Sequence, residues 1–160
     1  MNEDKNVIDL EARAAQQRAH RQGFLLTELD GSTIKSILES GYIDCELDVH
    51  GESIACDELR MVVSADPPRE VFKLYAFFWA KGRRQQVLEF CERFNANLVV
   101  VKAQMRDAPD KDGDWPVIID HDRLMFEQDR LAPRTLVKLV RRFQFIARNG
   151  MTRYDTEHLL

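Results

Sequence analysis

The residues of this chain that could do chemistry are few and lie far apart. The four histidines are His20, His50, His121 and His158. One of them lies in the run Asp120-His121-Asp122, whose donor types suit a metal site or acid-base work. If this run is a strand, the two aspartates share one face and the histidine points to the other, so the three groups do not converge. Polar residues on a surface are therefore the interpretation we favour.

Sequence motifs for catalysis are absent from the chain. It contains no G-x-S-x-G, no H-E-x-x-H and neither of the two glycine-rich phosphate-binding patterns. Residues far apart in the sequence could still come together in the fold as a site. Because no set of titrating groups converges in the sequence, we predict that the protein is not an enzyme and that it holds neither a metal nor another cofactor.

A loop rich in aspartate, between Arg106 and Trp115, invites comparison with a calcium site. With Gly113 at the sixth position of a calcium-binding loop, however, Ala108 takes the first position and Ile119 the twelfth, where carboxylates are required. The calcium pattern therefore fails, and we expect a solvated loop between two strands.

The three cysteines, Cys45, Cys56 and Cys91, form no C-x-x-C pair, so neither a zinc site nor a disulfide framework is indicated. His50-Gly51 has the composition of a two-residue hairpin turn, which would set Cys45 opposite Cys56. Such a pair could act as a redox switch. In a reducing cytoplasm, two small buried hydrophobic side chains are the interpretation we favour.

The stretch from Val71 to Met105 has the pattern strand, helix, strand and is predicted to form the centre of the fold. Val71 to Trp79 is apolar except for Lys73, and Leu98 to Val101 is rich in β-branched residues, so both are expected to be inner strands. The second of these strands is expected to continue to about Met105. Between them, Arg84 to Asn95 is predicted to be an amphipathic helix. Its apolar stripe consists of Val87, Leu88, Cys91 and Phe94.

Further elements are predicted on either side of this centre. Asp30 or Ser32 can cap a short helix over Ser32 to Ser40, and Gly41 ends it. Ile43 to Val49 alternates between apolar and acidic residues, which predicts a strand with one buried face. The remaining predicted strands are Leu59 to Ala65, before the turn Asp66-Pro67-Pro68, and Pro116 to Phe126.

Length and composition favour one domain with tails. The 160 residues are 44% hydrophobic and 31% charged, which is enough for one core and too little for two. We expect an N-terminal arm over residues 1–23, as a frayed helix or a disordered segment, one α+β domain over residues 24–150 and a C-terminal tail over residues 151–160. The net charge of -4 argues against bulk affinity for nucleic acid. With neither an apolar segment of membrane-spanning length nor a signal-peptide pattern, the expected location is the cytoplasm.

The last predicted helix, Pro133 to about Arg148, has two separate faces. One face is apolar, and the opposite face carries Arg134, Lys138, Arg141, Arg142 and Arg148. Phe145 lies among these basic residues. An exposed aromatic side chain between cations is typical of a binding surface, so the candidate partner-binding residues are Phe145, Arg141, Arg142, Lys138 and Arg134. The simpler interpretation, to which we give more weight, packs Phe145 under the N-terminal arm or in a dimer contact and leaves the cations solvated.

A second basic cluster, Lys81, Arg83 and Arg84, lies where the central helix begins. The helix dipole disfavours cations at that end, so an acidic group should compensate them. Arg83 and Arg84 could bind an anionic partner together with exposed backbone amides. They could also pair with acidic side chains of the same chain, which is the commoner arrangement.

These segments together resemble the YbjN family. The resemblance rests on ILESGYIDCELDVHG, on VFKLYAFFW, on LEFCERFNANLVVVKAQM with its Phe94-Asn95-x-Asn97 exit, and on a closing helix after Leu131-Ala132-Pro133. Members of that family resemble class I type III secretion chaperones in fold and are described as bacterial sensory transduction regulators. The resemblance therefore implies one antiparallel sheet of about five strands, with elements in the order α-β-β-β-α-β-β-α.

The function that the resemblance implies is a non-enzymatic bacterial protein-binding module, chaperone-like or regulatory, with a protein partner and no catalytic residues. An open sheet with edge strands is also compatible with a homodimer. The alternative is a nucleic-acid-linked regulator that uses the basic face of the last helix on phosphates. The acidic strand residues Asp44, Glu46 and Asp48 argue against this alternative.

Overall fold

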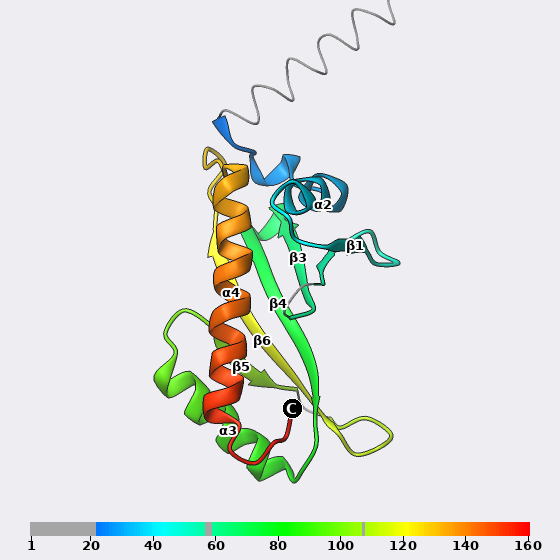
Figure 1. Cartoon of the computed structure of the whole chain (residues 1–160), viewed down its shortest axis with the longest axis vertical. Helices are drawn as coiled ribbons and strands as arrows, with labels where there is room; N and C mark the ends of the chain where they lie inside the picture. Colours follow the sequence, from blue (N-terminus) through cyan, green and yellow to red (C-terminus); the bar gives the residue numbers. More distant parts are fainter. Residues whose placement is uncertain (1–21, 57–58, 107) are drawn as a thin grey trace, which may run out of the picture.

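The computed structural model describes residues 22–56, 59–106 and 108–160 (Figure 1). The predicted N-terminal arm therefore lies outside the described residues, apart from residues 22 and 23. In chain order the main elements are α2 (Gly31–Ser40), β1 (Cys45–Leu47), β2 (Ser53–Ala55), β3 (Met61–Asp66), β4 (Val71–Ala80), α3 (Arg84–Asn97), β5 (Lys102–Met105), β6 (Trp115–Leu124) and α4 (Pro133–Tyr154). Within the described ranges, no helix is both long and apolar enough to cross a membrane.

The six strands form one antiparallel sheet in the order β1-β2-β3-β4-β6-β5. The prediction of an α+β fold with one antiparallel sheet is thus confirmed. Four strands precede α3, however, where the predicted order had three, because the chain between Cys45 and Asp66 forms three short strands before it turns into β4. The long strands β4 and β6 pair along their whole length and form the centre of the sheet.

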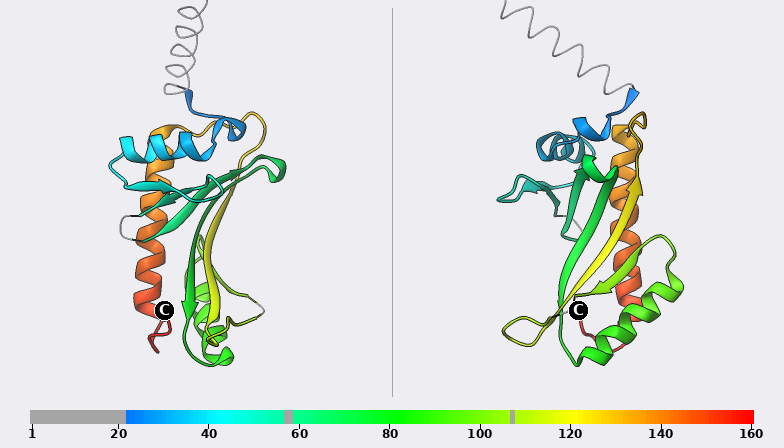
Figure 2. Two further views of the ribbon diagram at one scale, coloured as in Figure 1. Left: turned by 90° about the vertical axis from the view of Figure 1, so that its right-hand side faces the viewer. Right: turned by 180° about the vertical axis from the view of Figure 1, so that it is seen from behind.

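Helices α2 and α4 cover one face of the sheet, and α3 lies beside its β5 edge (Figure 1, Figure 2). Alternate residues of β4 build the covered layer, since Phe72, Leu74 and Ala76 are almost fully buried. The helices add apolar stripes to the same core, Val87, Phe90, Cys91 and Phe94 from α3 and Leu136, Val140, Phe143 and Ala147 from α4. The stripe predicted for the central helix is confirmed except at Leu88, which is only half-buried.

Three local predictions are confirmed. The predicted turn after β3 is present as the short 3-10 helix η2 (Pro67–Arg69). The acidic loop joins β5 to β6 as a hairpin, which the amide of Arg106 closes by donating to the carbonyl of Pro116 at 2.8 Å. The first helix has Asp30 as its cap, and the carboxylate of Asp30 accepts a backbone hydrogen bond from the first turn at 2.7 Å.

The first predicted strand is shorter than expected. β1 covers only Cys45–Leu47, although the alternation predicted a strand over Ile43 to Val49. Val49, the last apolar residue of that pattern, is 94% exposed because the chain has already entered the turn. The alternation therefore runs past the end of the buried layer.

The register of this hairpin differs by one residue from the prediction. Cys45 pairs with Ala55, so it does not lie opposite Cys56. The loop holds three residues instead of two, since the amide of Asp48 donates to the carbonyl of Glu52 at 2.9 Å. The predicted pairing of the two thiols is therefore wrong.

The strand predicted from Leu98 to about Met105 is confirmed only from Lys102 to Met105, and its first part, Leu98 to Val101, is not a strand. β5 begins only at Lys102, and it is an edge strand instead of an inner one. Val99 is 87% exposed, and only Val101 of this run is fully buried. The run is the turn by which the chain leaves α3 and reverses into β5, and this geometry overrides the β propensity of its valines.

The last residues of the chain pack against the domain. α4 runs to Tyr154, whereas the prediction ended it near Arg148 and left residues 151–160 as a tail. Beyond the helix, Leu159 is buried, and its carbonyl accepts a hydrogen bond from the amide of Lys81 at 2.8 Å. The amide of Leu159 donates to the carboxylate of Asp155 at 2.8 Å. The chain therefore folds back over the end of β4.

Candidate functional site

The candidate partner-binding residues lie together on the outward side of α4, which runs along the front of the molecule in Figure 1. Pro133 suits the first position of this helix, because its fixed φ fits a helix and no intrahelical amide is needed there. The helical period then turns the apolar residues toward the sheet and the basic residues away from it. We use the name basic face for Arg134, Lys138, Arg141, Arg142, Phe145 and Arg148, all of which are exposed.

The charge of the basic face is not balanced within its own helix. The 22 residues of α4 contain no aspartate and no glutamate. The guanidinium of Arg141 is held in place, since Nη2 donates to the carbonyl of Gly41 at 2.9 Å. That carbonyl lies at the carboxyl end of α2, where the helix dipole favours a cation. The side chains of α4 thus present charge of one sign.

Phe145 lies at the centre of the basic face and is 64% exposed. Phe143, two residues earlier on the same helix, is 2% exposed and belongs to the core. Two residues turn a helix by about 200°, so one buried and one exposed phenylalanine are expected at this spacing. The other interpretation, in which the N-terminal arm covers Phe145, concerns residues outside the described ranges and stays a prediction.

The second basic cluster lies where α3 begins, and that helix start is capped from within. The backbone amide of Arg83 donates to the side-chain oxygen of Gln86 at 2.8 Å. The side-chain nitrogen of Gln86 donates to the carboxylate of Glu157, near the end of the chain. The guanidinium of Arg84 lies 6.0 Å from the centre of the Trp115 ring. Whether the charges of Arg83 and Arg84 are compensated by acidic side chains of the same chain or by an anionic partner stays a prediction.

Side chains also occupy both edges of the sheet. At the β5 edge, the carboxamide of Asn95 accepts from the amide of Ala103 and donates to its carbonyl, both at 2.8 Å, as a neighbouring strand would. At the β1 edge, the ammonium of Lys35 donates to the carbonyl of Cys45 at 2.7 Å. A partner strand could not add to β5 without displacing Asn95, which favours a face over an edge as the docking site.

The side chains of the run Asp120-His121-Asp122 do not converge on one point. Nδ1 of His121 lies 2.9 Å from the carbonyl oxygen of Val100, while Asp120 and Asp122 alternate to the opposite face of β6, as the sequence predicts. Burial, and after it the charge of Asp122, raises the pKa of Asp120. Burial raises the pKa of the Cys91 thiol to about 11, so this thiol is protonated at neutral pH. Among the residues that the structure describes, no group of three or more His, Cys, Asp or Glu side chains could hold a metal ion.

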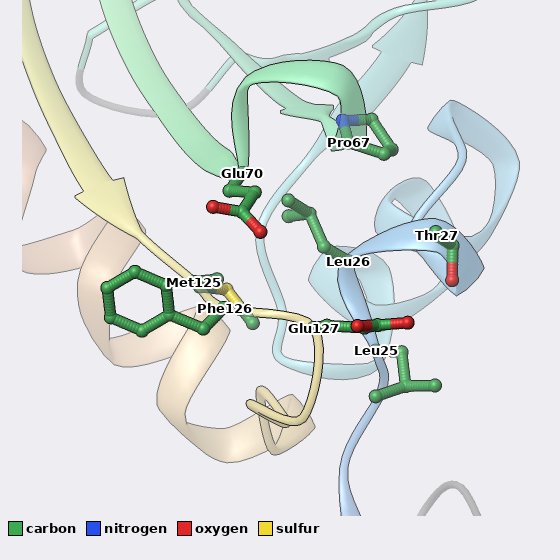
Figure 3. Close-up of a pocket in the computed structure, with 8 residues that line it drawn as sticks. All are labelled: Leu25, Leu26, Thr27, Pro67, Glu70, Met125, Phe126 and Glu127. Carbon is green, nitrogen blue, oxygen red and sulfur yellow. The ribbon is translucent and has the colours of Figure 1, made fainter.

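A hollow of about 260 Å³ opens near the start of the described chain (Figure 3). Its lining comes from the 3-10 helix η1 (Leu26–Glu28) and the residue before it, the turn between β3 and β4, and the residues after β6. The amide of Met125 donates to the carbonyl of Glu70 at 2.8 Å and ties two of these segments together. The ionisable groups of the lining are the carboxylates of Glu70 and Glu127.

Comparison with known proteins places the fold. No protein-family model matches the chain, and no curated protein matches it in sequence. The crystal structure of YbjN from E. coli, a proposed transcription regulator, aligns with a TM-score of 0.63 and 12% sequence identity, over 81% of this chain and 93% of that chain. The chain shares the fold of YbjN. The predicted resemblance is thereby confirmed for the fold. At 12% sequence identity, a shared fold does not show a shared function.

Two other solved structures also align. One is a protein from Methanothermobacter thermautotrophicus, with a TM-score of 0.52 and 11% identity, over 81% of this chain and 99% of that chain. The other is a chain of the HopA1–SchA chaperone–effector complex, with a TM-score of 0.44 and 16% identity, over 74% of this chain and 89% of that chain.

Two surface features of this fold were not predicted from the sequence. One is the closure of the β5 edge by Asn95, because no local pattern shows which backbone groups a side chain will reach. The other is the exposure of aromatic residues on β4. A signal for it was present, since Tyr75, Phe77 and Trp79 alternate with Leu74, Ala76 and other apolar residues, a pattern that indicates a strand with two apolar faces.

Proposed function

We propose that the protein is a non-enzymatic protein-binding module, chaperone-like or regulatory, and that the basic face of α4 receives its partner. The observation that carries this proposal is the exposed Phe145 among cations, on a helix without acidic residues. An aromatic ring supplies desolvated contact area, and the arginines around it supply charge complementarity. A bacterial, cytoplasmic setting is part of the proposal.

The shape of the basic face suits a partner that docks with its side chains. A helix of 22 residues is about 33 Å long, which is enough to contact an extended or helical segment of a partner along several turns. Arg141 and Arg142 flank Phe145 and can each bind a carboxylate through two hydrogen bonds. Strand addition is disfavoured at β5 because Asn95 already satisfies the edge-facing N–H and C=O of Ala103.

Affinity capture from the lysate of the source cell, with and without nuclease, tests the proposal. The tagged wild-type chain is expected to retain a stoichiometric protein partner after nuclease treatment. Phe145→Ala is expected to lose this partner while keeping the thermal midpoint of the wild type. Phe126→Ala is the matched control, because Phe126 is 61% exposed and lies outside α4, and it is expected to retain the partner. A partner that Phe145→Ala still captures in full contradicts the assignment of the site.

A nucleic-acid-linked regulator is the second candidate, and the charge of one sign on α4 is the observation that favours it. The role in transcription proposed for E. coli YbjN agrees with this candidate. The structural similarity between the two proteins concerns the fold alone. Its test is duplex DNA binding as a function of salt, since log affinity falls with log salt by about 0.9 per phosphate contact. Replacing Arg141 and Arg142 by glutamine is expected to reduce that slope, and an affinity that salt does not change would exclude phosphate recognition.

A further inference from the structure

The side of the sheet that faces away from α2 and α4 carries an apolar surface, and no helix of the described residues covers it (Figure 2). On β4, the residues that alternate with the buried ones are Tyr75, Phe77 and Trp79. Phe77 and Trp79 are each 46% exposed, and their rings meet edge to face with centres 5.0 Å apart. We use the name outer face for this side of the sheet, with Tyr75, Phe77 and Trp79 at its centre.

Neighbouring strands extend the apolar surface sideways. Ile118 of β6 pairs with Phe77, and Val62 of β3 pairs with Tyr75. Ile54 of β2 in turn pairs with Val62. An antiparallel sheet that has one face in water normally carries polar residues there, and a contiguous apolar patch on a surface marks a site of association.

Charged residues of both signs border the outer face. A hollow of about 400 Å³ beside its aromatic residues is lined by Arg69, Lys73 and Arg106 and by Asp120 and Asp122. Lys73 and Asp122 lie directly opposite each other on β4 and β6. The basic face of α4 differs in this respect, because all its charged side chains are cations.

We propose that the outer face binds the outer face of a second copy of this chain, so that the two sheets stack around a two-fold axis. In such a contact each surface meets itself. A surface with charge of one sign repels its copy, whereas a surface with both signs can match cations to carboxylates across the axis. Repulsion between like charges therefore disfavours a self-contact through the basic face, whereas the outer face can meet its own copy. Stacked sheets lie about 10 Å apart, a spacing that aromatic and aliphatic side chains fill.

The dimer leaves both basic faces accessible, because α4 lies on the opposite side of the sheet from the outer face (Figure 2). The two basic faces of a dimer point away from each other. A partner with two docking segments can then bind both, and its second segment binds with the advantage of high effective concentration.

Sedimentation equilibrium of the full chain tests the proposal. Between about 1 and about 100 µM, where a micromolar dimer dissociates, the average mass is expected to rise from 18.6 kDa toward twice that value. Trp79→Glu places a charge at the centre of the contact and is expected to weaken the dimer at least about tenfold. Phe145→Glu makes the same kind of change on the basic face and is the matched control, with no change of mass expected.

A second measurement serves if Trp79→Glu does not fold. The chain has two tryptophans, so Trp115→Phe leaves Trp79 as the remaining fluorophore. Its quenching by acrylamide is expected to fall as the protein concentration rises. A chain that stays monomeric at the highest concentration overturns the proposal, as does a dimer in which Trp79 is quenched equally at every concentration. A dimer that Phe145→Glu dissociates and Trp79→Glu does not also overturns it.

Discussion

Replacing two phenylalanines of α4 separately by alanine distinguishes a core residue from a surface residue on one helix. Phe143→Ala removes a side chain that is 2% exposed, and Phe145→Ala removes one that is 64% exposed. Both positions lie in the interior of α4, so the change in helix propensity is the same in the two variants. The difference between their free energies of unfolding therefore reports burial.

The two variants are expected to differ by several kcal/mol. Truncation of a buried phenylalanine costs about 3 to 5 kcal/mol, which is the expected loss for Phe143→Ala. Full burial of such a side chain contributes about 1.5 to 3 kcal/mol, and about a third of Phe145 is hidden, so its contacts contribute about 0.5 to 1 kcal/mol. The higher helix propensity of alanine offsets about 0.5 kcal/mol of that loss. Phe145→Ala is thus expected to be nearly neutral.

Thermal unfolding of the wild type and both variants measures this difference. For a chain of 160 residues, a change of 1 kcal/mol shifts the midpoint by about 2 to 4 °C. Phe143→Ala is therefore expected to lower the midpoint by about 6 to 20 °C, and Phe145→Ala by less than about 2 °C. If Phe145→Ala melts as low as Phe143→Ala, then Phe145 is packed in the folded protein, and its assignment as an exposed binding residue is refuted.

Three further predictions concern the closed sheet edge, a helix crossing and a buried thiol. Asn95→Ala leaves the outward-pointing N–H and C=O of the buried residue Ala103 without their partner, so urea unfolding is expected to show a loss of about 1 to 3 kcal/mol, and the Ala103 amide is expected to exchange its hydrogen faster. Unchanged exchange would show that Asn95 does not close the edge. Gly150→Ala would bring a Cβ to 2.5 Å from the Phe94 ring, and overpacking of about 1 to 3 kcal/mol is expected to outweigh the roughly 1 kcal/mol that alanine gains in a helix. A more stable Gly150→Ala variant would mean that the crossing of α3 and α4 can relax. The folded state raises the pKa of Cys91 to about 11, so the stabilisation linked to its protonated thiol is complete below pH 9.0 and is lost as the pH rises toward 11. Cys91→Ala is expected to lose less stability than the wild type over that range in urea unfolding, and an equal loss would argue against this linkage.

Periodicity predicted those elements whose burial repeats along the chain. The stripes of α3 and α4 return at helical spacing, and the long strand β4 is apolar over nearly its whole length, so each was recognised from local residues. The position of Phe145 among cations follows from the same period. This part of the candidate site was therefore readable from the sequence, because a helix fixes the direction of each side chain relative to its neighbours.

The features that the sequence did not predict depend on contacts between segments that are far apart in the chain. In the first hairpin, the predicted turn set Cys56 opposite Cys45 as a buried side chain, whereas the structure buries Ser53 and Ala55. Ser53 can be buried because its hydroxyl donates to the carbonyl of Gly31, which lies 22 residues earlier in the chain. A hydrophobicity pattern cannot predict the burial of a polar residue whose hydrogen-bond partner lies in another element.

The run after α3 shows the same limit for propensity. Leu98 to Val101 has the composition of a strand, yet α3 ends beside the edge of the sheet, and the chain needs these residues to reverse its direction before β5. Val101 is buried, at 1% exposure, and Leu98 packs against the core while partly buried. The path between two elements depends on where both are packed, and composition does not contain that information.

The closure of the β5 edge by Asn95 also sets an order of events while the protein is being made. Asn95 precedes Ala103 by eight residues, so it leaves the ribosome first, and their contact closes a short loop at small entropic cost. β6, which pairs with the other side of β5, is synthesised later. A nascent chain can therefore cover the outer edge of β5 before the inner edge has its partner. Copies of the chain emerge close together on a polysome, where an unpaired strand edge can pair with another copy. With its outer edge covered by Asn95, β5 has only the edge that β6 will pair with left unpaired.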